Sequence, residues 1–355
     1  MSIQESYERI YGASPVAIQQ VPGRVNLIGE HTDYNGGLVL PTAINKSVSV
    51  AIGEAADDYY YFTSAIFPDP VRRDLSKIRT GHWSDYPLAA FAWLKAQGGW
   101  QKGAEVYIDS DLPHGSGLSS SAALIVAILK AVTELTGPYM TDTEVAKAAQ
   151  RVENEYLAVP CGIMDQMAVA VARPGQALLL NTETLAFELI ELPHAHSFVV
   201  AHSGVYRRLD EGRYALRRRE CDAAAAALGV KLLCHLTEES AKGLIPKLEQ
   251  PMRQRARHVW TEHCRVQQAA SALRAHELEE LGQLMTESHH SMRDDFEISL
   301  PVIDEMVDCS RRFGALGARL TGGGFGGCFV SLVETAKVDD WQQRMLQAFP
   351  EITFV

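Results

Sequence analysis

The chain is organised around residues 112–123, which read Leu112-Pro113-His114-Gly115-Ser116-Gly117-Leu118-Ser119-Ser120-Ser121-Ala122-Ala123. Before this stretch, residues 104–109 alternate apolar and polar side chains with period two, which predicts a strand. After it, apolar residues recur at three- and four-residue spacing over residues 120–136, which predicts a helix. The glycine- and serine-rich loop therefore ends at a helix N-terminus.

A loop in this position favours a bound anion. The first turn of a helix leaves N–H groups unpaired and carries about half a positive charge. Gly115 and Gly117 permit positive φ angles and close approach of a ligand, and the serine hydroxyls can donate to phosphate or ligate magnesium. An ordinary serine N-cap explains the same composition equally well. The loop alone leaves both interpretations open.

Two common nucleotide-binding motifs are excluded. The chain contains no G-x-x-x-x-G-K-[ST] sequence, so it is not a P-loop ATPase of the usual kind. A formal G-x-G-x-x-G occurs at Gly322, Gly324 and Gly327, but the apolar residues 328–333 that follow predict a strand. A dinucleotide-binding fingerprint requires a helix at that point.

Composition describes a soluble globular protein in a reducing compartment. The 355 residues are enough for two domains, and 46% are hydrophobic and 22% charged. The net charge of −11 argues against nucleic acid or an anionic membrane as a partner. The six cysteines form no C-x-x-C and have no histidine at zinc-ligand spacing. The first residues lack the features of a signal peptide, so a cytoplasmic location is expected.

A second polar cluster, residues 22–37, lies between two strand-like runs and is expected to form a loop. Its charged and titratable members near four glycines are Arg24, Glu30, His31 and Asp33. Carboxylates and an imidazole at close range suit a polyhydroxylated ligand, because each carboxylate can accept from two hydroxyls. On turn chemistry alone, a solvated turn with surface charges is the favoured alternative.

The motifs of the chain resemble those of a known family. Residues 23–35, G-R-V-N-L-I-G-E-H-T-D-Y-N, resemble the signature of galactokinases, and residues 115–123 resemble the ATP loop of the wider GHMP kinase family. Residues 161–166, 287–296 and 321–328 resemble galactokinase segments in the same order. The resemblance therefore extends from about Pro22 to Val333.

This resemblance implies a fold and an activity. The implied fold is the α+β, two-domain GHMP kinase fold, with a ribosomal-protein-S5-like N-terminal domain over residues 1–180 and a ferredoxin-like α/β C-terminal domain over residues 181–355. The active site would occupy the cleft between them. The implied reaction transfers the γ-phosphoryl of ATP to the C1 hydroxyl of α-D-galactose with Mg²⁺, giving galactose 1-phosphate and ADP, the first committed step of the Leloir pathway.

The resemblance also assigns residues to the sugar and the chemistry. The implied sugar-binding residues are Arg24, Glu30, His31, Asp33, Gly162, Asp165 and Tyr214. Asp165 matches the catalytic aspartate, as a general base or as the group that orients the hydroxyl, and Arg24 matches its arginine partner. From the residues alone, Asp165 before an apolar segment is also typical of an N-cap. The family usually has Asn after the tyrosine where this chain has Ala215.

Nucleotide and metal contacts follow from the same resemblance. The implied nucleotide-binding residues are Trp83, Gly115, Ser116, Gly117, Leu118, Ser119, Ser120 and Ser121. Ser120 and Glu153 are the implied magnesium ligands. From spacing alone, Trp83 is at least as well explained as a core aromatic, and Glu153 can be a surface charge. Pro87 stands where the family commonly has Val, which leaves the start of the following helix open.

Two alternatives to the predicted galactokinase activity are kept. The first is a GHMP kinase for another sugar, such as N-acetylgalactosamine, arabinose or a uronic acid. The second is a galactose- and ATP-binding sensor without catalysis, against which the intact Arg24, Glu153 and Asp165 argue. The expected partners are D-galactose and ATP, with no nucleic acid and no membrane. We expect a monomer, with a weak homodimer as the alternative.

Overall fold

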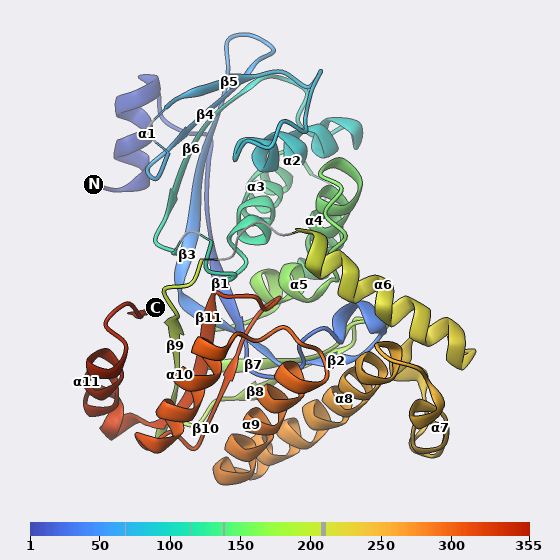
Figure 1. The fold of residues 1–355 in the computed structure, drawn as a ribbon. Coiled ribbons are helices and arrows are strands. Elements are labelled where there is room, and N and C mark those ends of the chain that lie inside the picture. Colours follow the sequence, from blue (N-terminus) through green and yellow to red (C-terminus); the bar gives the residue numbers. More distant parts are fainter. Residues whose placement is uncertain (68, 114, 138, 207–210) are drawn as a thin grey trace. The chain divides into compact units, whose positions relative to one another are not determined.

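The computed structural model describes residues 1–67, 69–113, 115–137, 139–206 and 211–355 (Figure 1). The chain forms two compact units, each assembled from several segments. Unit 1 comprises Met1–Arg24, Ile44–Leu112 and Ser119–Val171, and unit 2 comprises Val25–Ala43, Pro113–Leu118 and Ala172–Val355. His114, within the predicted phosphate loop, lies outside the described residues. The expected division into family domains at residue 180 stays a prediction.

Unit 1 contains a mixed sheet. Its strands are β1 (Ala17–Asn26), β3 (Pro41–Glu54), β4 (Tyr60–Ser64), β5 (Val71–Arg73) and β6 (Ala104–Ser110), and the last residues of β1 and the first of β3 belong to unit 2. β3 pairs with β1 and runs antiparallel to β6, β6 runs parallel to β4, and β4 runs antiparallel to β5. The predicted strand at 104–109 is confirmed as β6. Arg24 lies within β1, so the prediction that it belongs to a loop was wrong.

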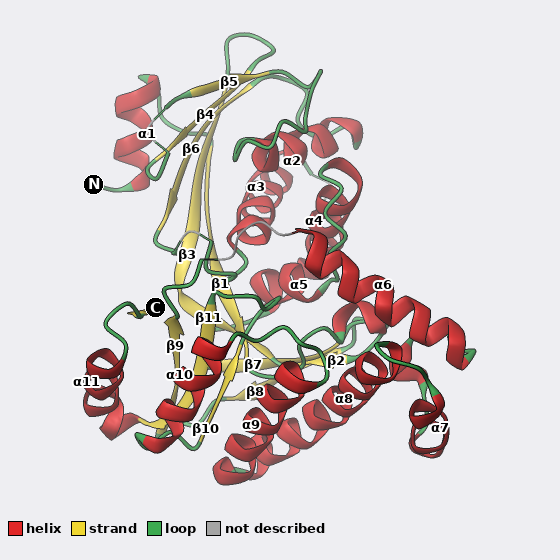
Figure 2. Cartoon of the chain, in the orientation of Figure 1, coloured by secondary structure: helices red, strands yellow, loops and turns green. Residues whose placement is uncertain are grey.

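Helices complete the described part of unit 1 (Figure 2). They are α1 (Ile3–Tyr11), α2 (Asp85–Ala96), α3 (Ser120–Thr136), α4 (Asp142–Arg151) and α5 (Met164–Val171). Figure 1 shows α1 on one side of the strands, where it packs on β6, and α2, α3 and α4 on the other. The predicted helix over 120–136 is confirmed as α3. α3 is buried on most of its sides, because α2, α4 and α5 all pack against it.

Capping explains where α4 begins. The Thr141 hydroxyl accepts from the Glu144 N–H at 3.3 Å, and the Glu144 carboxylate accepts from the Thr141 N–H at 2.8 Å. This reciprocal box satisfies two otherwise unpaired donors. α4 begins at Asp142 and continues as a π-helical turn over Val152–Tyr156. That turn contains Glu153, and such turns are frequent at functional sites.

Unit 2 contains a four-stranded antiparallel sheet in the order β10-β11-β9-β12. The strands of this unit are β2 (Leu38–Val39), β7 (Gln176–Asn181), β8 (Phe187–Glu191), β9 (His196–His202), β10 (Gly317–Leu320), β11 (Cys328–Glu334) and β12 (Thr353–Phe354). β7 pairs antiparallel with both β2 and β8. The glycine-rich segment 321–327 connects β10 to β11 and leads into a strand, as predicted. The exclusion of a dinucleotide-binding loop is therefore confirmed.

The helices of unit 2 cover this sheet and one another. They are α6 (Glu211–Leu228), α7 (Glu238–Leu244), α8 (Met252–Ala275), α9 (Leu278–Asp294), α10 (Pro301–Arg312) and α11 (Val338–Ala348). α9 and α10 pack on β10, and α8 packs between α6 and α9. The fully buried Phe296, Phe329 and Trp341 belong to the core of the unit. None of the described helices has the length and apolar character needed to cross a bilayer.

Candidate active site

Unit 1 brings Arg24 and Asp165 into an ion pair. Arg24, on β1, has only 4% of its side chain exposed, and its Nε and Nη2 both donate to Asp165 Oδ1, at 2.8 and 2.5 Å. Asp165 is the second residue of α5, so it lies inside the helix and does not cap it. Its side chain is 34% exposed, and no described residue hydrogen-bonds to Oδ2. The pair thus presents an accessible carboxylate oxygen beside a buried cation, and the predicted Gly162 lies buried just before α5.

Glu153 lies in the same unit and is buried. Burial raises the pKa of its carboxyl group to about 7, against hydrogen bonds from Gln166, Ser121 and Cys161 that lower the pKa. The carboxylate and the Ser121 hydroxyl form a pair of hard oxygen donors, which suits Mg²⁺ when phosphate oxygens and water complete its coordination. Among the described residues, no group of three or more His, Cys, Asp or Glu could hold a metal by itself. The exposed Ser120 stays a predicted ligand.

The N-terminus of α3 carries an unsatisfied hydroxyl. Ser119 precedes the helix with φ of +64°, and its side chain makes no capping hydrogen bond. Its Oγ is buried and has no hydrogen-bond partner among the described residues. A buried hydroxyl without a partner costs free energy, which an anion at the helix N-terminus would recover. The N-cap alternative is therefore not what the structure contains.

The loop residues that precede α3 belong to unit 2. Gly115 and Gly117 have φ angles of +69° and +76°, the left-handed conformation that glycine adopts at no steric cost. The Ser116 hydroxyl donates to the Pro113 carbonyl at 2.7 Å, which closes a tight turn. Leu118 is buried, so only its backbone can face a ligand. These backbone conformations are compatible with a phosphate-binding loop, which stays a prediction.

Trp83 lies two residues before α2 and is half-buried. The Phe67 ring stacks on it with a centroid separation of 5.2 Å and an interplanar angle of 11°, and Phe62 meets it edge to face at 6.4 Å. One face of the indole is therefore covered by Phe67. This arrangement fits both predicted interpretations, a base-stacking surface and part of an aromatic cluster.

Unit 2 contains the remaining predicted sugar residues. Glu30 Oε1 accepts from the Gly322 N–H at 2.7 Å and from the Thr321 hydroxyl at 3.2 Å. His31 has φ of +61°, an uncommon angle for a residue with a side chain, and its Nδ1 lies 2.8 Å from the Tyr34 hydroxyl. The glycine-rich segment therefore contacts the signature segment directly.

Aromatic rings surround His31. Tyr214, on α6, lies 5.3 Å from it between ring centroids, and Phe296 lies at 4.7 Å. Asp33 is half-buried and begins the short 3-10 helix Asp33–Asn35. Unit 2 thus brings Tyr214 close to His31, the residue that directly follows Glu30 in the chain.

Several residues that hold these groups have no signal in the sequence pattern. Glu262, His258 and Arg319 contact Glu30 from α8 and β10, and Gln166 holds Glu153. Glu262 and His258 occupy ordinary positions of a helical pattern, so periodicity gives no signal for them. Arg319 directly precedes Leu320 and the glycine-rich motif, and that proximity was the only available indication.

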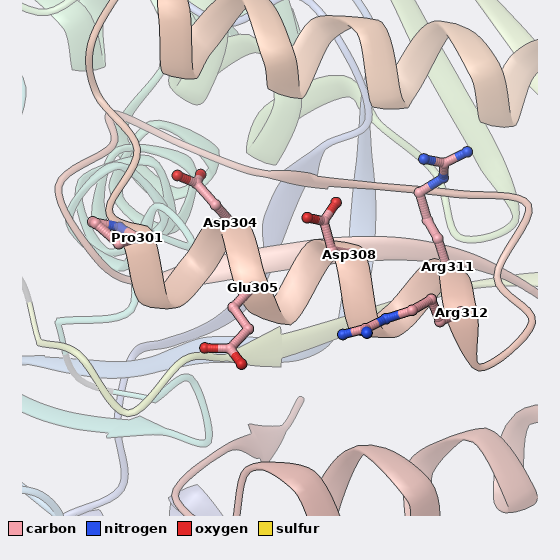
Figure 3. A pocket seen from close by; sticks show the side chains of 6 residues that line it. All are labelled: Pro301, Asp304, Glu305, Asp308, Arg311 and Arg312. Atoms are coloured by element: carbon pink, nitrogen blue, oxygen red, sulfur yellow. The ribbon is translucent and has the colours of Figure 1, made fainter.

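A hollow on α10 contains none of the predicted site residues (Figure 3). All of its lining side chains come from this one helix: Pro301, Asp304, Glu305, Asp308, Arg311 and Arg312. Its three acids precede its two arginines along the helix, and Asp304 also lies 3.1 Å from the buried His289.

Comparisons with known proteins identify the family of the chain. The galactokinase galactose-binding signature matches residues 5–54, the GHMP kinases N terminal domain matches residues 85–173, and the GHMP kinases C terminal domain matches residues 269–351. A galactokinase from a Roseiflexus species is 39% identical over 99% of this chain and 92% of its own length. The chain belongs to the galactokinase family. A Streptomyces coelicolor galactokinase is 38% identical over 98% of this chain and 92% of its own length.

Solved structures support the same family. Lactococcus lactis galactokinase in complex with galactose matches with a TM-score of 0.91 and 30% identity, covering 99% of this chain and 96% of its own. Methanococcus jannaschii mevalonate kinase matches with a TM-score of 0.68 and 22% identity, covering 97% of this chain and 98% of its own, and shows the shared fold alone. The predicted two-domain α+β GHMP kinase fold is confirmed. This kinase is an ATP-dependent sugar kinase.

Proposed function

We propose that this kinase transfers the γ-phosphoryl of ATP to the C1 hydroxyl of α-D-galactose, giving galactose 1-phosphate and ADP. The observation that carries the proposal is the Arg24–Asp165 pair, an accessible carboxylate held by a buried cation at 2.5 Å. A similar chain from Lactococcus lactis was solved with galactose bound, which supports galactose as the sugar.

Asp165 acts on the reacting hydroxyl. Oδ1 is engaged by Arg24, so Oδ2 accepts the hydrogen bond of the C1 hydroxyl and orients its oxygen toward phosphorus. Arg24 keeps the carboxylate in one orientation and offers positive charge to the transferring phosphoryl group. Because phosphoryl transfer proceeds through a loose transition state, orientation supplies much of the rate, and Asp165 takes the proton as the new bond forms.

Sugar recognition is assigned to the residues that the family resemblance indicates. Glu30, His31, Asp33 and Tyr214 accept from or pack on the sugar, and Arg24, Gly162 and Asp165 contact the reacting end. Carboxylates with fixed orientation discriminate hydroxyl positions well, because a sugar lacking one hydroxyl leaves a buried acceptor unpaired. The cost of leaving such an acceptor unpaired is the basis of the proposed preference for galactose.

Nucleotide binding is assigned to Trp83 and the loop Gly115–Ser121. The orphan Ser119 hydroxyl and the N-terminus of α3 receive phosphate oxygens, and the indole contacts the base. Glu153, with the Ser120 or Ser121 hydroxyl, holds Mg²⁺. When bound, this ion neutralises charge on the phosphates of ATP.

Location and assembly belong to the same proposal. All six cysteines are free thiols, which supports a reducing cytoplasm. We propose that the enzyme acts there as a monomer on the two small substrates, galactose and ATP.

The test is ATP consumption with Mg²⁺ against galactose, N-acetylgalactosamine, arabinose, glucose and galacturonate, with the phosphorylated position determined by NMR. The highest kcat/KM for galactose with phosphate at C1 is expected. Turnover of another sugar alone would replace the substrate and keep the kinase. Galactose binding without turnover would make the protein a sensor.

A further inference from the structure

Every backbone polar group of Glu30 is held by one helix, α8. The Glu30 N–H donates to Glu262 Oε1 at 3.3 Å, and its carbonyl lies 3.1 Å from His258 Nε2. Its side-chain Oε1 accepts from Gly322 and Thr321 of the glycine-rich segment. No described residue hydrogen-bonds to Oε2. Glu30 therefore has one fixed carboxylate oxygen and one that is available to a ligand.

Glu262 is the centre of this arrangement. It is fully buried, and its Oε1 also accepts from the Gly29 N–H at 2.9 Å and the Ser288 hydroxyl at 2.6 Å. Its Oε2 pairs with Arg265 at 2.8 Å. Burial raises the pKa of Glu262, but Arg265 and Arg319 outweigh burial and lower the pKa to about 2. Glu262 is consequently an anion at any working pH.

Arg319 lies between two carboxylates. It is fully buried on β10, with Nη1 at 3.4 Å from Glu30 Oε1 and Nη2 at 3.7 Å from Glu262 Oε1. The same Nη1 donates to the Asn26 carbonyl at 3.1 Å. Arg319 and Glu262 together hold the signature segment at Asn26, Gly29 and Glu30.

Glycine at position 29 is part of this packing. Gly29 has φ of +108°, and a Cβ there would lie 2.9 Å from the Leu38 carbonyl oxygen and from Val266 of α8. No side chain fits between the segment and α8. The Gly29 N–H can therefore reach the buried Glu262 directly.

We propose that Glu262 and Arg319 are positioning residues for Glu30, which fix its carboxylate so that Oε2 meets a hydroxyl of the sugar. The inference rests on the proposed sugar-binding role of Glu30 and adds the residues through which that role depends on α8 and β10. Neither Glu262 nor Arg319 touches the substrate in this scheme.

Charge sharing gives the proposal its specific consequence. Arg319 divides its attraction between Glu30 and Glu262. In Glu262→Gln, Glu30 becomes the only carboxylate near Arg319, so its charge is drawn away from the sugar hydroxyl. The Gln side chain keeps an oxygen that can accept from the Gly29 and Glu30 N–H groups. Its amide nitrogen replaces the Oε2 that pairs with Arg265, so the variant loses this ion pair together with the negative charge near Arg319.

The experiment measures steady-state kinetics of Glu262→Gln, Glu30→Gln and the double variant. Each single variant is expected to raise the KM for the sugar by about 10-fold or more, with kcat and the KM for ATP within about 3-fold of wild type. If Glu262 acts through Glu30, the double variant exceeds Glu30→Gln by no more than about 2-fold in KM. Independent, multiplying effects would overturn the proposal.

A matched control separates positioning from general stability. Ser310 and Ser331 share a buried hydrogen bond of 2.8 Å in the same unit, and neither contacts the signature segment. Ser310→Ala should lower the unfolding temperature without changing the sugar KM. A raised sugar KM in this control would show that stability alone explains the effect.

A second variant tests the proposal independently, in case Glu262→Gln does not fold. Arg319→Lys keeps the charge but loses the fork that reaches Asn26, Glu30 and Ser288 at once, so it should also raise the sugar KM. An unchanged KM in a folded Arg319→Lys enzyme would contradict the inference. If wild type prefers another sugar, the proposed function fails, and the coupling is still measured with that sugar.

Discussion

Two carboxylates of the proposed site, Asp165 and Glu30, are held in opposite ways. The Asp165 side chain is 34% exposed and bonded through one oxygen to one arginine, Arg24. Glu30 is 2% exposed, and its carboxylate is bonded to a backbone N–H, a hydroxyl and Arg319. Each acid pairs with an arginine, but only Glu30 is fixed from several directions.

The difference matches what each acid is proposed to do. A group that takes a proton must reach the reacting oxygen and change its charge state, so it keeps an accessible oxygen. A group that recognises a hydroxyl works best when its geometry is fixed before the ligand arrives. Reaction and recognition are thus separated between an open acid and an enclosed one.

The largest expected effect comes from removing the open acid. Asp165→Asn keeps an oxygen for Arg24 but cannot take a proton, so kcat should fall by about 10³-fold or more. Galactose affinity, measured by calorimetry without turnover, should change by less than about 10-fold, because the sugar contacts of unit 2 remain. Full activity in this variant would exclude Asp165 from the mechanism. The contrast between a reacting Asp165 and a recognising Glu30 would then be wrong.

The second prediction concerns Glu153, which belongs to the reaction side. Glu153→Gln keeps the size of the side chain and its contact with Gln166 but removes a charged donor. The Mg²⁺ concentration for half-maximal rate should rise by about 10- to 100-fold, as expected when an oxygen ligand is weakened. The galactose KM at saturating Mg²⁺ should stay near wild type. An unchanged Mg²⁺ dependence would exclude Glu153 as a ligand.

The third prediction tests the enclosed side through pH. Burial lowers the pKa of His258 to about 4, below the ordinary value of 6.5, so the unfolded state binds more protons between those values. The contribution of His258 to the free energy of unfolding should therefore be complete above pH 6.5 and decrease by up to about 1.4 kcal/mol per pH unit toward pH 4. Denaturant titrations between pH 7 and 5 measure this slope.

His258→Asn is the comparison variant for that slope. It removes His258, whereas His263 and His290 of unit 2, whose pKa values are also lowered by burial, remain. The slope should become shallower and persist in part. An identical slope in wild type and variant would mean that His258 does not stay neutral in the folded state.

The smallest expected effect lies away from both acids. Thr141→Ala removes one bond of the capping box of α4 and should lower the free energy of unfolding by about 1 kcal/mol. Both KM values should remain unchanged, because Thr141 contacts no proposed ligand. Ser2→Ala in the matching box of α1 provides the control. A changed galactose KM would mean that α4 transmits strain to Asp165 or Glu153.

Local chemistry let the sequence predict most elements. Period-two alternation predicted β6, and apolar spacing predicted α3. Arg24 was placed in a loop because glycine and proline precede it, yet sheet pairing with β3 extends β1 to Asn26. Such pairing depends on a neighbour that is distant in the sequence.

The residues that hold the site were less predictable. The family motifs indicated Glu30 and Asp165, whereas Glu262 and Arg319 became evident only from contacts across more than 200 residues of chain. A buried glutamate and a buried arginine look like ordinary surface residues of a helix and a strand when read one at a time. Glu262 and Arg319 can be buried because their charges neutralise each other, and no local sequence pattern indicates that pairing.

The division of the chain between the two units also determines the order in which the site can form during synthesis. The signature segment leaves the ribosome early. Glu262, which accepts the hydrogen bond of the Gly29 N–H, is synthesised 233 residues later. Until α8 is synthesised, residues 25–43 lack the buried anion and the helix against which they pack. The segment that is proposed to contact the sugar is therefore translated early and obtains these contacts late.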